Sequence, residues 1–283
     1  MVKDLVANSP FIDIRFIESG SKLNNLGSEA IFDYYKLEAN TLQFQISRDF
    51  TDYRITPYFS EDQIKDLKIE NFHFDSLSYF QISQFLNQNT FSSIEIVKSD
   101  ISVYLELPDS YESYLSTLSK KNRHELKRKK RIFVDKFGDI SFEKSKNSDI
   151  FDEFVRLHKK SKGEKGKYMT ETVVDFYRSL IEHENWYIYY INYNDSMISS
   201  AFVYESEIVD YLYNSCRDHS LEEFNTGTYL NDQLLQNSIN NKKRYFDYLK
   251  GEEKYKFNFG GQVHQLYDLK IKVWIFFSLH FTP

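Results

Sequence analysis

The pattern of apolar and polar positions in the first hundred residues predicts mainly β-strands. Four runs are apolar and β-branched or alternate with polar residues, namely residues 11–17, 42–46, 94–97 and 101–107. One helix is expected between them, over residues 75–88, with Asp75 or Ser76 as its N-cap. The first part of the chain is therefore expected to form a sheet with few helices.

Pro108 and Asp109 interrupt the strand pattern, and helices alternate with strands after them. Ser110 is a suitable N-cap for a long helix through residue 133, because apolar residues recur at helical spacing from Tyr111 to Leu126. Further on we expect strands at 139–144, 185–193, 196–205, 207–215, 244–250 and 265–273, and helices at 148–162, 170–184 and 225–241. This order is typical of an α/β or α+β protein with mixed sheets, and it places a domain boundary near residue 108.

The composition is that of a chain with a large core. Hydrophobic residues make up 41% of the 283 residues and charged residues 28%, which argues against disorder and indicates about two domains. The single cysteine, Cys216, excludes a disulfide framework and a cysteine-rich zinc site. No apolar run is long enough for a transmembrane helix, and the N-terminus lacks the apolar core of a signal peptide. The expected location is the cytoplasm.

Several catalytic and cofactor motifs are absent from the sequence. None of the seven histidines lies in HExxH and no two are four residues apart, so we expect no helical zinc site and no metal. The sequence also lacks GxSxG, GxxxxGK[ST] and GxGxxG, the signatures of a nucleophile elbow, a Walker loop and a dinucleotide site. The loop at residues 162–167 contains two glycines, and we interpret it as a solvated turn.

A short basic run contrasts with the overall net charge of -6. Residues 120–131 contain eight Lys or Arg and one Glu, a local charge of about +7. Such a run attracts phosphates of a nucleotide or tRNA, an anionic glycan or a membrane surface, or else it is a solvated helix face. No aromatic residue interrupts it, so contacts with nucleic acid are expected at phosphates rather than at bases.

The last apolar run covers residues 273–281. It is too short to span a bilayer. It is either a final buried element or an exposed patch for a partner or a membrane surface.

Several motif residues, which lie in two stretches of the chain, resemble the sequence pattern of a known family. They are Leu118-Ser119 with Arg123, Tyr213 with Asp218, Thr226-Gly227, and Asp247 with Gly251 and Tyr255-Lys256. On these residues the chain from 109 to 270 resembles the acyltransferase domain shared by the Fem-like branch of the GNAT superfamily and CelD-like polysaccharide-biosynthesis proteins. The chain departs from the family at Asn225-Thr226-Gly227, which stands where the family has Ser-Pro-Gly, and at Ser215-Cys216-Arg217, where the family is often glycine-rich.

The resemblance implies an α/β fold of tandem GNAT-like domains, with mixed, mainly antiparallel sheets flanked by helices. Residues 1–108 are then a degenerate first copy, and residues 109–283 are the acyltransferase domain.

The resemblance also implies the residues of the site. The catalytic residues are Asp247, Tyr255 and Lys256, the acyl-CoA-binding residues are Thr226, Gly227 and Thr228, and the substrate-binding residues are Arg123, Tyr213, Asp218 and Glu252. Backbone N–H groups at a helix start suit a pyrophosphate, and a tyrosine can protonate a leaving thiolate. We expect Tyr255 and Lys256 to be neighbours in a strand, with side chains on opposite faces.

The implied activity is N-acyl transfer from acyl-CoA, without a metal, to an amine such as an amino sugar or amino acid moiety in cell-envelope or polysaccharide biosynthesis. Two alternatives remain open. One is a Fem-type peptidoglycan peptidyltransferase that takes its group from aminoacyl-tRNA bound by residues 120–131. The other is a non-catalytic module that binds nucleic acid or a glycan.

Overall fold

The computed structural model describes residues 1–273 except 22, 24–29, 33–34, 55, 57–59, 88–90, 139 and 141. The chain divides into two compact units. The first contains Met1–Val6, Phe11–Ile101 and the chain from Gln265 onward, and the second contains Ala7–Pro10 and Ser102–His264. The expected domains, residues 1–108 and 109–283, stay a prediction. Of the apolar run at 273–281, all but the first residue lies outside the described chain.

The first unit contains a sheet and four α-helices among its described residues. The strands are β1 (Ala30–Phe32), β2 (Tyr35–Glu38), β3 (Thr41–Phe44), β4 (Asn71–Leu77), the first part of β5 (Phe91–Glu106) and most of β11 (Gln262–Val273). The helices are α1 (Val2–Ala7), α2 (Ile14–Ser21), α3 (Glu61–Asp66) and α4 (Tyr79–Leu86), with 3-10 turns at Pro10–Ile12 and Arg48–Phe50. Strands β1 to β4 and β11 neighbour each other in that order, and β3 and β4 are parallel.

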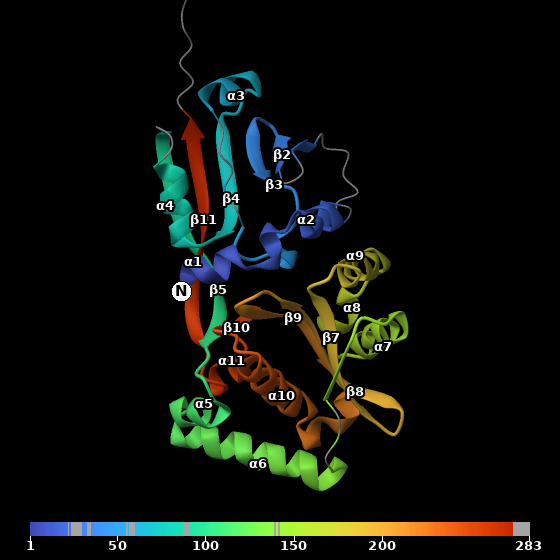
Figure 1. The fold of residues 1–283 in the computed structure, drawn as a ribbon. Coiled ribbons are helices and arrows are strands. Elements are labelled where there is room, and N and C mark those ends of the chain that lie inside the picture. The colour runs from blue at the N-terminus through green and yellow to red at the C-terminus, as the bar shows by residue number, and fades with distance from the viewer. Residues whose placement is uncertain are drawn as a thin grey trace, which may run out of the picture. The chain divides into compact units, whose positions relative to one another are not determined.

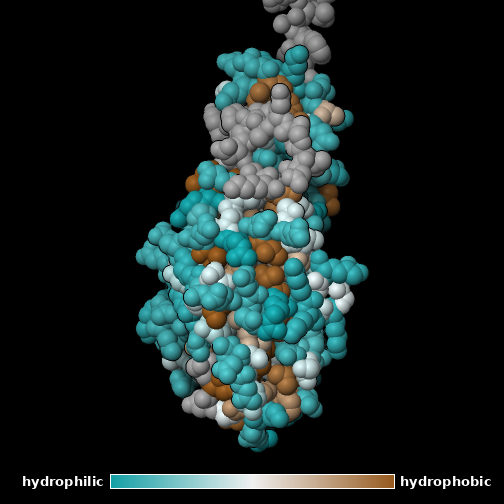
Figure 2. All heavy atoms as spheres, turned by 90° about the vertical axis from the view of Figure 1, so that its right-hand side faces the viewer, coloured by the Kyte–Doolittle hydropathy of each residue, from teal (hydrophilic) through white to brown (hydrophobic). Residues whose placement is uncertain are grey.

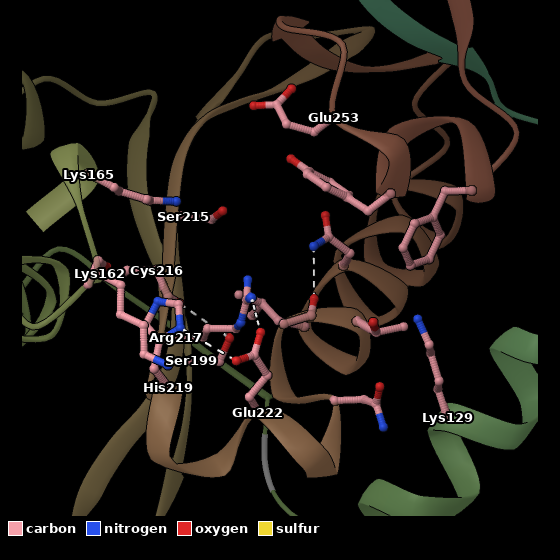
Figure 3. Close-up of a pocket in the computed structure, with 18 residues that line it drawn as sticks. Lys129, Lys162, Lys165, Ser199, Ser215, Cys216, Arg217, His219, Glu222 and Glu253 are labelled. Carbon is pink, nitrogen blue, oxygen red and sulfur yellow. Dashed lines mark hydrogen bonds and ion pairs between the residues drawn. The ribbon is translucent and has the colours of Figure 1, made fainter.

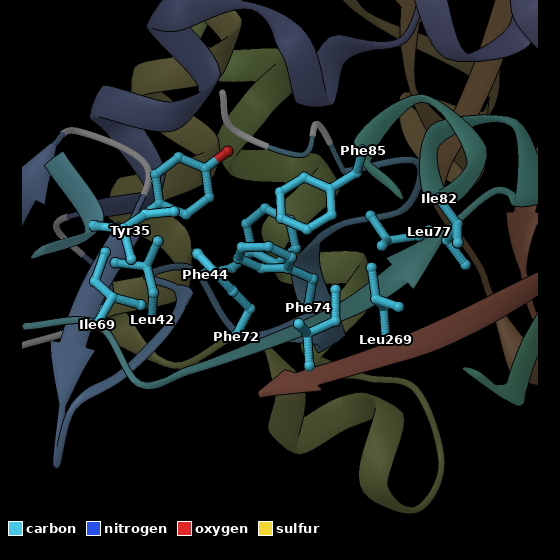
Figure 4. Packing of buried hydrophobic residues seen from close by; sticks show 12 residues of the cluster. Tyr35, Leu42, Phe44, Ile69, Phe72, Phe74, Leu77, Ile82, Phe85 and Leu269 are labelled. Atoms are coloured by element: carbon cyan, nitrogen blue, oxygen red, sulfur yellow. The ribbon is translucent and has the colours of Figure 1, made fainter. Parts of the chain in front are cut away.

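Aromatic side chains of β4 form the centre of this unit's core (Figure 4). The rings of Phe72 and Phe74 each lie 5.5 Å from the ring of Phe85 in α4. The centroid distances and steep ring angles are those of favourable edge-to-face pairs. The same cluster contains Leu269 of β11, so this part of β11 is held by packing as well as by strand pairing.

Two local expectations for the first unit were wrong. Residues 11–17 form a 3-10 turn and the start of α2 rather than a strand, because Asp13 accepts a hydrogen bond from the backbone N–H of Arg15 at 2.9 Å and starts the helix. The helix expected at 75–88 begins at Tyr79, after Ser78 and Gln81 form a capping box. The residues before Ser78 belong to β4.

The second unit contains a mixed sheet. After the end of β5, the order is β10 (Tyr245–Lys250), β9 (Val209–Arg217), β8 (Ser196–Glu205), β7 (Trp186–Tyr193) and β6 (Phe142–Ser145). All neighbours are antiparallel except β10 and β9, which are parallel. The expected fold class, mixed and mainly antiparallel sheets flanked by helices, is confirmed.

Helices cover both faces of this sheet (Figure 1). They are α5 (Tyr111–Thr117), α6 (Lys120–Phe137), α7 (Ser148–Lys159), α8 (Glu164–Tyr168), α9 (Glu171–Ile181), α10 (Thr226–Asn240) and α11 (Lys254–Asn258), with a 3-10 turn at His219–Phe224. Phe202 of β8 packs on Phe154 of α7 and lies opposite Ile188 in β7. The next residue of β7, Tyr189, accepts a hydrogen bond from Asn237 of α10. Because successive side chains of a strand point to opposite faces, α7 and α10 lie on opposite faces of the sheet.

The long helix expected from residue 111 to 133 is two helices. Leu118 is extended, and Ser119 accepts a hydrogen bond from the N–H of Asn122 at 3.2 Å, so a new helix begins at Lys120. The loop expected at 162–167 contains the short helix α8, and Tyr255 and Lys256, expected in a strand, lie in α11. Each difference comes from a cap or turn that a periodic pattern does not reveal.

Most of the large apolar side chains are buried in the core of the protein. On the face drawn in Figure 2, hydrophilic residues predominate and hydrophobic ones show in small groups between them. No helix in the described part of the chain is both long and apolar enough to cross a membrane.

Candidate functional site

Strands β9 and β10 separate at one end of their pairing. They pair in parallel only from Val209 opposite Tyr245 to Tyr211 opposite Asp247, although β9 continues to Arg217. Strand β10 turns away at Leu249, which has a left-handed φ of 58°. The backbone of β9 beyond Tyr211 is therefore not paired with β10 and can meet a bound molecule.

Asp247 holds this turn in place. Its fully buried carboxylate accepts hydrogen bonds from the N–H of Leu249 at 2.7 Å and from the hydroxyl of Ser102 at 3.2 Å. A left-handed conformation is unfavourable for a residue with a side chain, and the hydrogen bond from Leu249 compensates for it. The predicted catalytic residue Asp247 thus stabilises the turn at which the two strands diverge. It does not line either of the cavities described below.

A cavity of about 550 Å³ lies at the separated end of β9 (Figure 3). Its lining comes from every element around this end: Lys129 of α6, Ser161, Lys162 and Lys165 after α7, Ser199 of β8, Ser215, Cys216 and Arg217 of β9, His219, Glu222 and Asn225, Gly227, Thr228, Leu230 and Asn231 of α10, and Glu253, Tyr255 and Phe259 around α11. The volume is in the usual range for sites that bind small molecules or cofactors.

A second cavity of about 420 Å³ adjoins the first. The two share Lys129, Thr228, Tyr255 and Phe259 in their linings. Residues of α6 and α11 complete the second one: Lys121, Asn122, Glu125, Leu126, Lys254 and Asn258. The basic helix α6 thus contributes directly to the walls of a site.

The N-terminus of α10 opens into the first cavity. Asn225 precedes it with φ 58° and ψ 36° and forms no side-chain cap, while Gly227 and Thr228 line the cavity. The first N–H groups of a helix have no partner within the helix, and this end carries positive potential. A side chain at Gly227 would bring a Cβ within 3.1 Å of Cδ of Arg217, so glycine keeps this approach open. The arrangement is suited to a phosphate.

The predicted acyl-CoA residues Gly227 and Thr228 are thus at the cavity surface. Thr226 is fully buried, and its hydroxyl has no hydrogen-bond partner among the described residues. Thr226 is not among the residues that line the cavity.

The cavity lining carries an excess of positive charge. Its cationic side chains are Lys129, Lys162, Lys165 and Arg217, and its carboxylates are Glu222 and Glu253. Arg217 is paired with Glu222 at 3.0 Å. Glu253 is paired with a lysine outside the lining, Lys256, at 2.9 Å. Both carboxylates therefore have close cationic partners, and they attract Lys162 and Lys165 only from a longer distance.

Tyr255 lies in the wall between the two cavities. Burial raises the pKa of its phenol well above the usual value, and the nearby carboxylate of Glu253 raises it further. The phenol therefore keeps its proton at neutral pH and is available as a proton donor, although the same shift makes it a weaker acid.

Lys256 lies beneath the same segment. Its buried ammonium donates hydrogen bonds to the carbonyl oxygens of Leu249, Lys250 and Gly251 at 3.1, 2.5 and 3.3 Å, and pairs with Glu253. These contacts hold the turn between β10 and α11. The ammonium of Lys256 is thus hydrogen-bonded to the backbone of that turn, and Lys256 lines neither cavity.

The predicted substrate-binding residues are not brought together. Arg123 donates to the carbonyl of Leu115 at 3.3 Å, and Tyr213 packs against Trp186 on the face covered by α7 and α9. Asp218 caps the 3-10 turn after β9 by accepting from Ser220. None of the three lines either of the two cavities described above.

Glu252 is exposed, and its neighbour Glu253 takes the position in the cavity wall. The chain turns at Gly251, with φ of 118°, and the absence of a Cβ there leaves room for the Glu253 carboxylate.

Sequence reasoning did not single out Lys162, Lys165, Arg217 or Asn231. The first two are in the segment interpreted as a solvated turn. Asn231 is four residues after Gly227, and its amide donates to the Gly227 carbonyl at 2.8 Å, so its spacing on the helix was the available signal.

Cys216 also lines the cavity, but burial raises the pKa of its thiol to about 12. A thiol with such a pKa stays protonated at neutral pH and is a poor nucleophile. Among the described residues, no group of three His, Cys, Asp or Glu side chains is placed to hold a metal ion.

Comparison with known proteins gives a match to one family model and several structures of similar fold. Residues 120–257 match the family model described as Acetyltransferase (GNAT) domain. A conserved protein of unknown function from Bacteroides thetaiotaomicron is similar in structure, with a TM-score of 0.61, 10% identity, and coverage of 93% of this chain and 91% of that one. No significant match was found among curated protein sequences.

Two further structures share the fold. One is the C-terminal domain (DUF2156) of a protein described as a putative lysylphosphatidylglycerol synthetase, from Agrobacterium fabrum, with a TM-score of 0.58, 12% identity, and coverage of 91% of this chain and 85% of that one. The other is FemX, with a TM-score of 0.53, 9% identity and 74% coverage of both chains. At these identities the likeness concerns the fold alone.

Proposed function

We propose that the protein is an N-acyltransferase that uses acyl-CoA, and the match of residues 120–257 to the GNAT acetyltransferase model supports this proposal. The acceptor in this proposal is an amine on an amino sugar or amino acid moiety, in cell-envelope or polysaccharide biosynthesis in the cytoplasm. The observation that carries the proposal is the cavity at the separated end of β9, which receives the uncapped N-terminus of α10.

The donor is held at the start of α10 in this proposal. The pyrophosphate of CoA accepts hydrogen bonds from the free backbone N–H groups at Gly227 and Thr228. Lys129, in the wall shared by both cavities, supplies a countercharge from α6. The thioester arm then runs along the unpaired edge of β9, where backbone groups are available to its amides.

The transfer step needs few groups from the protein. The neutral amine attacks the thioester carbonyl, a C–N bond forms, and the C–S bond breaks after a tetrahedral intermediate. A backbone N–H at the β9 edge stabilises the oxyanion, and Tyr255 gives its proton to the departing thiolate. The proton lost by the amine passes to solvent or to Glu253, the carboxylate in the same wall.

Calorimetric titration with acetyl-CoA tests the donor. The proposal expects saturable binding that a Gly227→Asp substitution abolishes or weakens at least tenfold, because the new carboxylate would stand where the pyrophosphate binds. Absence of acetyl-CoA binding by the unaltered protein refutes the proposal.

A Fem-type reaction, with aminoacyl-tRNA as donor, is a second candidate. It is favoured by the second cavity, whose wall includes Lys121 and Asn122 of the basic helix α6. Salt-sensitive tRNA binding without acetyl-CoA binding would establish this alternative, since binding that rests on phosphates neutralised by lysine and arginine weakens steeply as the salt concentration rises.

A further inference from the structure

We propose that the acceptor amine carries an anionic group, a phosphate or a carboxylate, which Lys162 and Lys165 bind on the face of the sheet opposite α10. The inference rests on the proposed acyl transfer and adds the chemical class of the acceptor. It is carried by the position of these two lysines, by their lack of ion-pair partners among the described residues, and by a buried hydroxyl beside them.

The cavity reaches both faces of the sheet around the end of β9. Cys216 points toward α7, where its thiol donates to the carbonyl of Phe154 at 3.7 Å. The next residue, Arg217, points toward α10, where its Cδ lies close to Gly227. Both residues line the cavity, so a ligand on one face can meet a ligand on the other at the edge of β9.

Lys162 and Lys165 belong to the α7 side of this cavity. They follow α7 and lie across the cavity from Lys129 of α6 (Figure 3). The donor proposed above occupies the α10 side, with its phosphates at Gly227 and Thr228. The amine must approach the thioester from the other side, so a group held by Lys162 and Lys165 belongs to the acceptor.

These two lysines are attracted by Glu222 and Glu253 only from beyond ion-pair distance. Neither forms an ion pair within the described part of the chain, whereas Arg217 is neutralised by Glu222. The side chains of Lys162 and Lys165 are exposed, and partial loss of water lowers the pKa of Lys165. An anionic group bound in the cavity would give these ammonium groups a direct partner.

Ser161 gives a second, independent indication of a ligand. Its side chain is 8% exposed and lines the cavity, and its hydroxyl has no hydrogen-bond partner among the described residues. A buried hydroxyl without a partner costs free energy unless a ligand satisfies it. A rotation of the Ser161 side chain into the cavity would let its hydroxyl donate to a phosphate or carboxylate oxygen, while the adjacent lysines neutralise the charge of that group.

The test compares matched amines on protein saturated with CoA. Calorimetry measures binding of O-phosphoethanolamine against ethanolamine, and of glycine against glycinamide, so that the phosphate and carboxylate sources are separated. We expect at least one anionic amine to bind with a dissociation constant tenfold or more below that of its neutral partner. Equal affinities within both pairs would overturn the inference.

The matched variants separate the acceptor from the donor. Lys162→Gln with Lys165→Gln is expected to remove the preference for the anionic amine while changing the dissociation constant of CoA by less than threefold. Lys159→Gln with Lys160→Gln, which removes the same charge from the adjacent segment outside the cavity lining, should retain the preference. A tenfold loss of CoA affinity in the first variant, with the preference retained, would assign the lysines to the donor and overturn the inference.

The two proposals fail in different ways. If the unaltered protein does not bind CoA, the proposed function fails. If it binds CoA but does not prefer an anionic amine, only the inference about the acceptor fails.

Discussion

Lys130 of α6 places its ammonium 2.8 Å from a carboxylate oxygen of Asp232 in α10, a residue with no exposed surface. The hydroxyl of Tyr111 donates to the other oxygen of Asp232, and the amide of Gln236 donates to the same oxygen as Lys130 at 2.7 Å. One cation of the basic run therefore neutralises a buried carboxylate and fixes α6 on α10 beside the cavities. The run is not a uniform surface for an anionic ligand.

This contact predicts that Lys130→Gln destabilises the fold. Removing one partner of a buried ion pair leaves an uncompensated charge, and the expected loss is roughly 3 kcal/mol, at the low end of such cases because Lys130 is partly exposed. Urea unfolding measures the change. Lys127→Gln is the control, since Lys127 is exposed on the same helix and its removal should change stability by less than about 0.5 kcal/mol. Equal midpoints for the two variants would contradict the prediction.

The donor site predicts a graded response at Gly227. An alanine there adds only a Cβ at 3.1 Å from Arg217, which a flexible arginine side chain can accommodate, so acetyl-CoA affinity should fall modestly. An aspartate adds a charge that repels the pyrophosphate, and affinity should fall at least tenfold while the melting temperature changes by only a few degrees. If calorimetry finds unchanged affinity in Gly227→Asp, the donor binds elsewhere.

Tyr255→Phe should lower kcat with little effect on KM for acetyl-CoA. The ring remains, but the proton donor is removed, and general acid catalysis typically contributes a factor of about 100 or more. Tyr248→Phe is a matched control, because its ring lies 5.7 Å from that of Tyr255 and its hydroxyl has no partner among the described residues. A kcat equal in both variants would remove Tyr255 from the mechanism.

The raised pKa of Tyr255 also predicts how kcat depends on pH. Because burial keeps the phenol protonated above its usual pKa, kcat should not decline through loss of this proton below about pH 10. A falling limb near neutral pH that disappears in Tyr255→Phe would contradict this expectation.

Asp210 predicts a pH dependence of stability. Burial raises its pKa to about 6, although Lys243 at 3.3 Å and the Ser238 hydroxyl at 2.6 Å oppose the shift. The folded state therefore holds the proton more tightly than the unfolded state, and stability should decrease as pH rises from about 4 to about 6.

The size of this effect is roughly 3 kcal/mol, from a shift of about two pKa units. Asp210→Asn should flatten the dependence, which denaturant unfolding at several pH values can measure. A stability that rises across this window equally in both proteins would show that Asp210 does not titrate there.

The sequence predicted the elements whose patterns are local. The strands of the second unit and the helix after residue 225 appear where their apolar spacing placed them, because period and capping depend on neighbouring residues. Gly227, Thr228 and Tyr255 were expected in the site from the family resemblance, and all three line the cavity. The run at residues 11–17 was misread, because partial alternation of apolar residues is compatible with both a strand and an amphipathic helix.

Only the tertiary structure decided which charges face the site. The left-handed turn after Asp247 separates β10 from β9, and the turn at Gly251 leaves room for the carboxylate of Glu253, which lines the cavity. Lys130 is paired with Asp232, 102 residues away, while Lys162 and Lys165 lie in the cavity wall without an ion pair among the described residues. The spacing of apolar residues indicates whether a segment is a helix or a strand. Which side chains of different elements come into contact depends on strand register and helix packing, and these arise only when the whole domain folds.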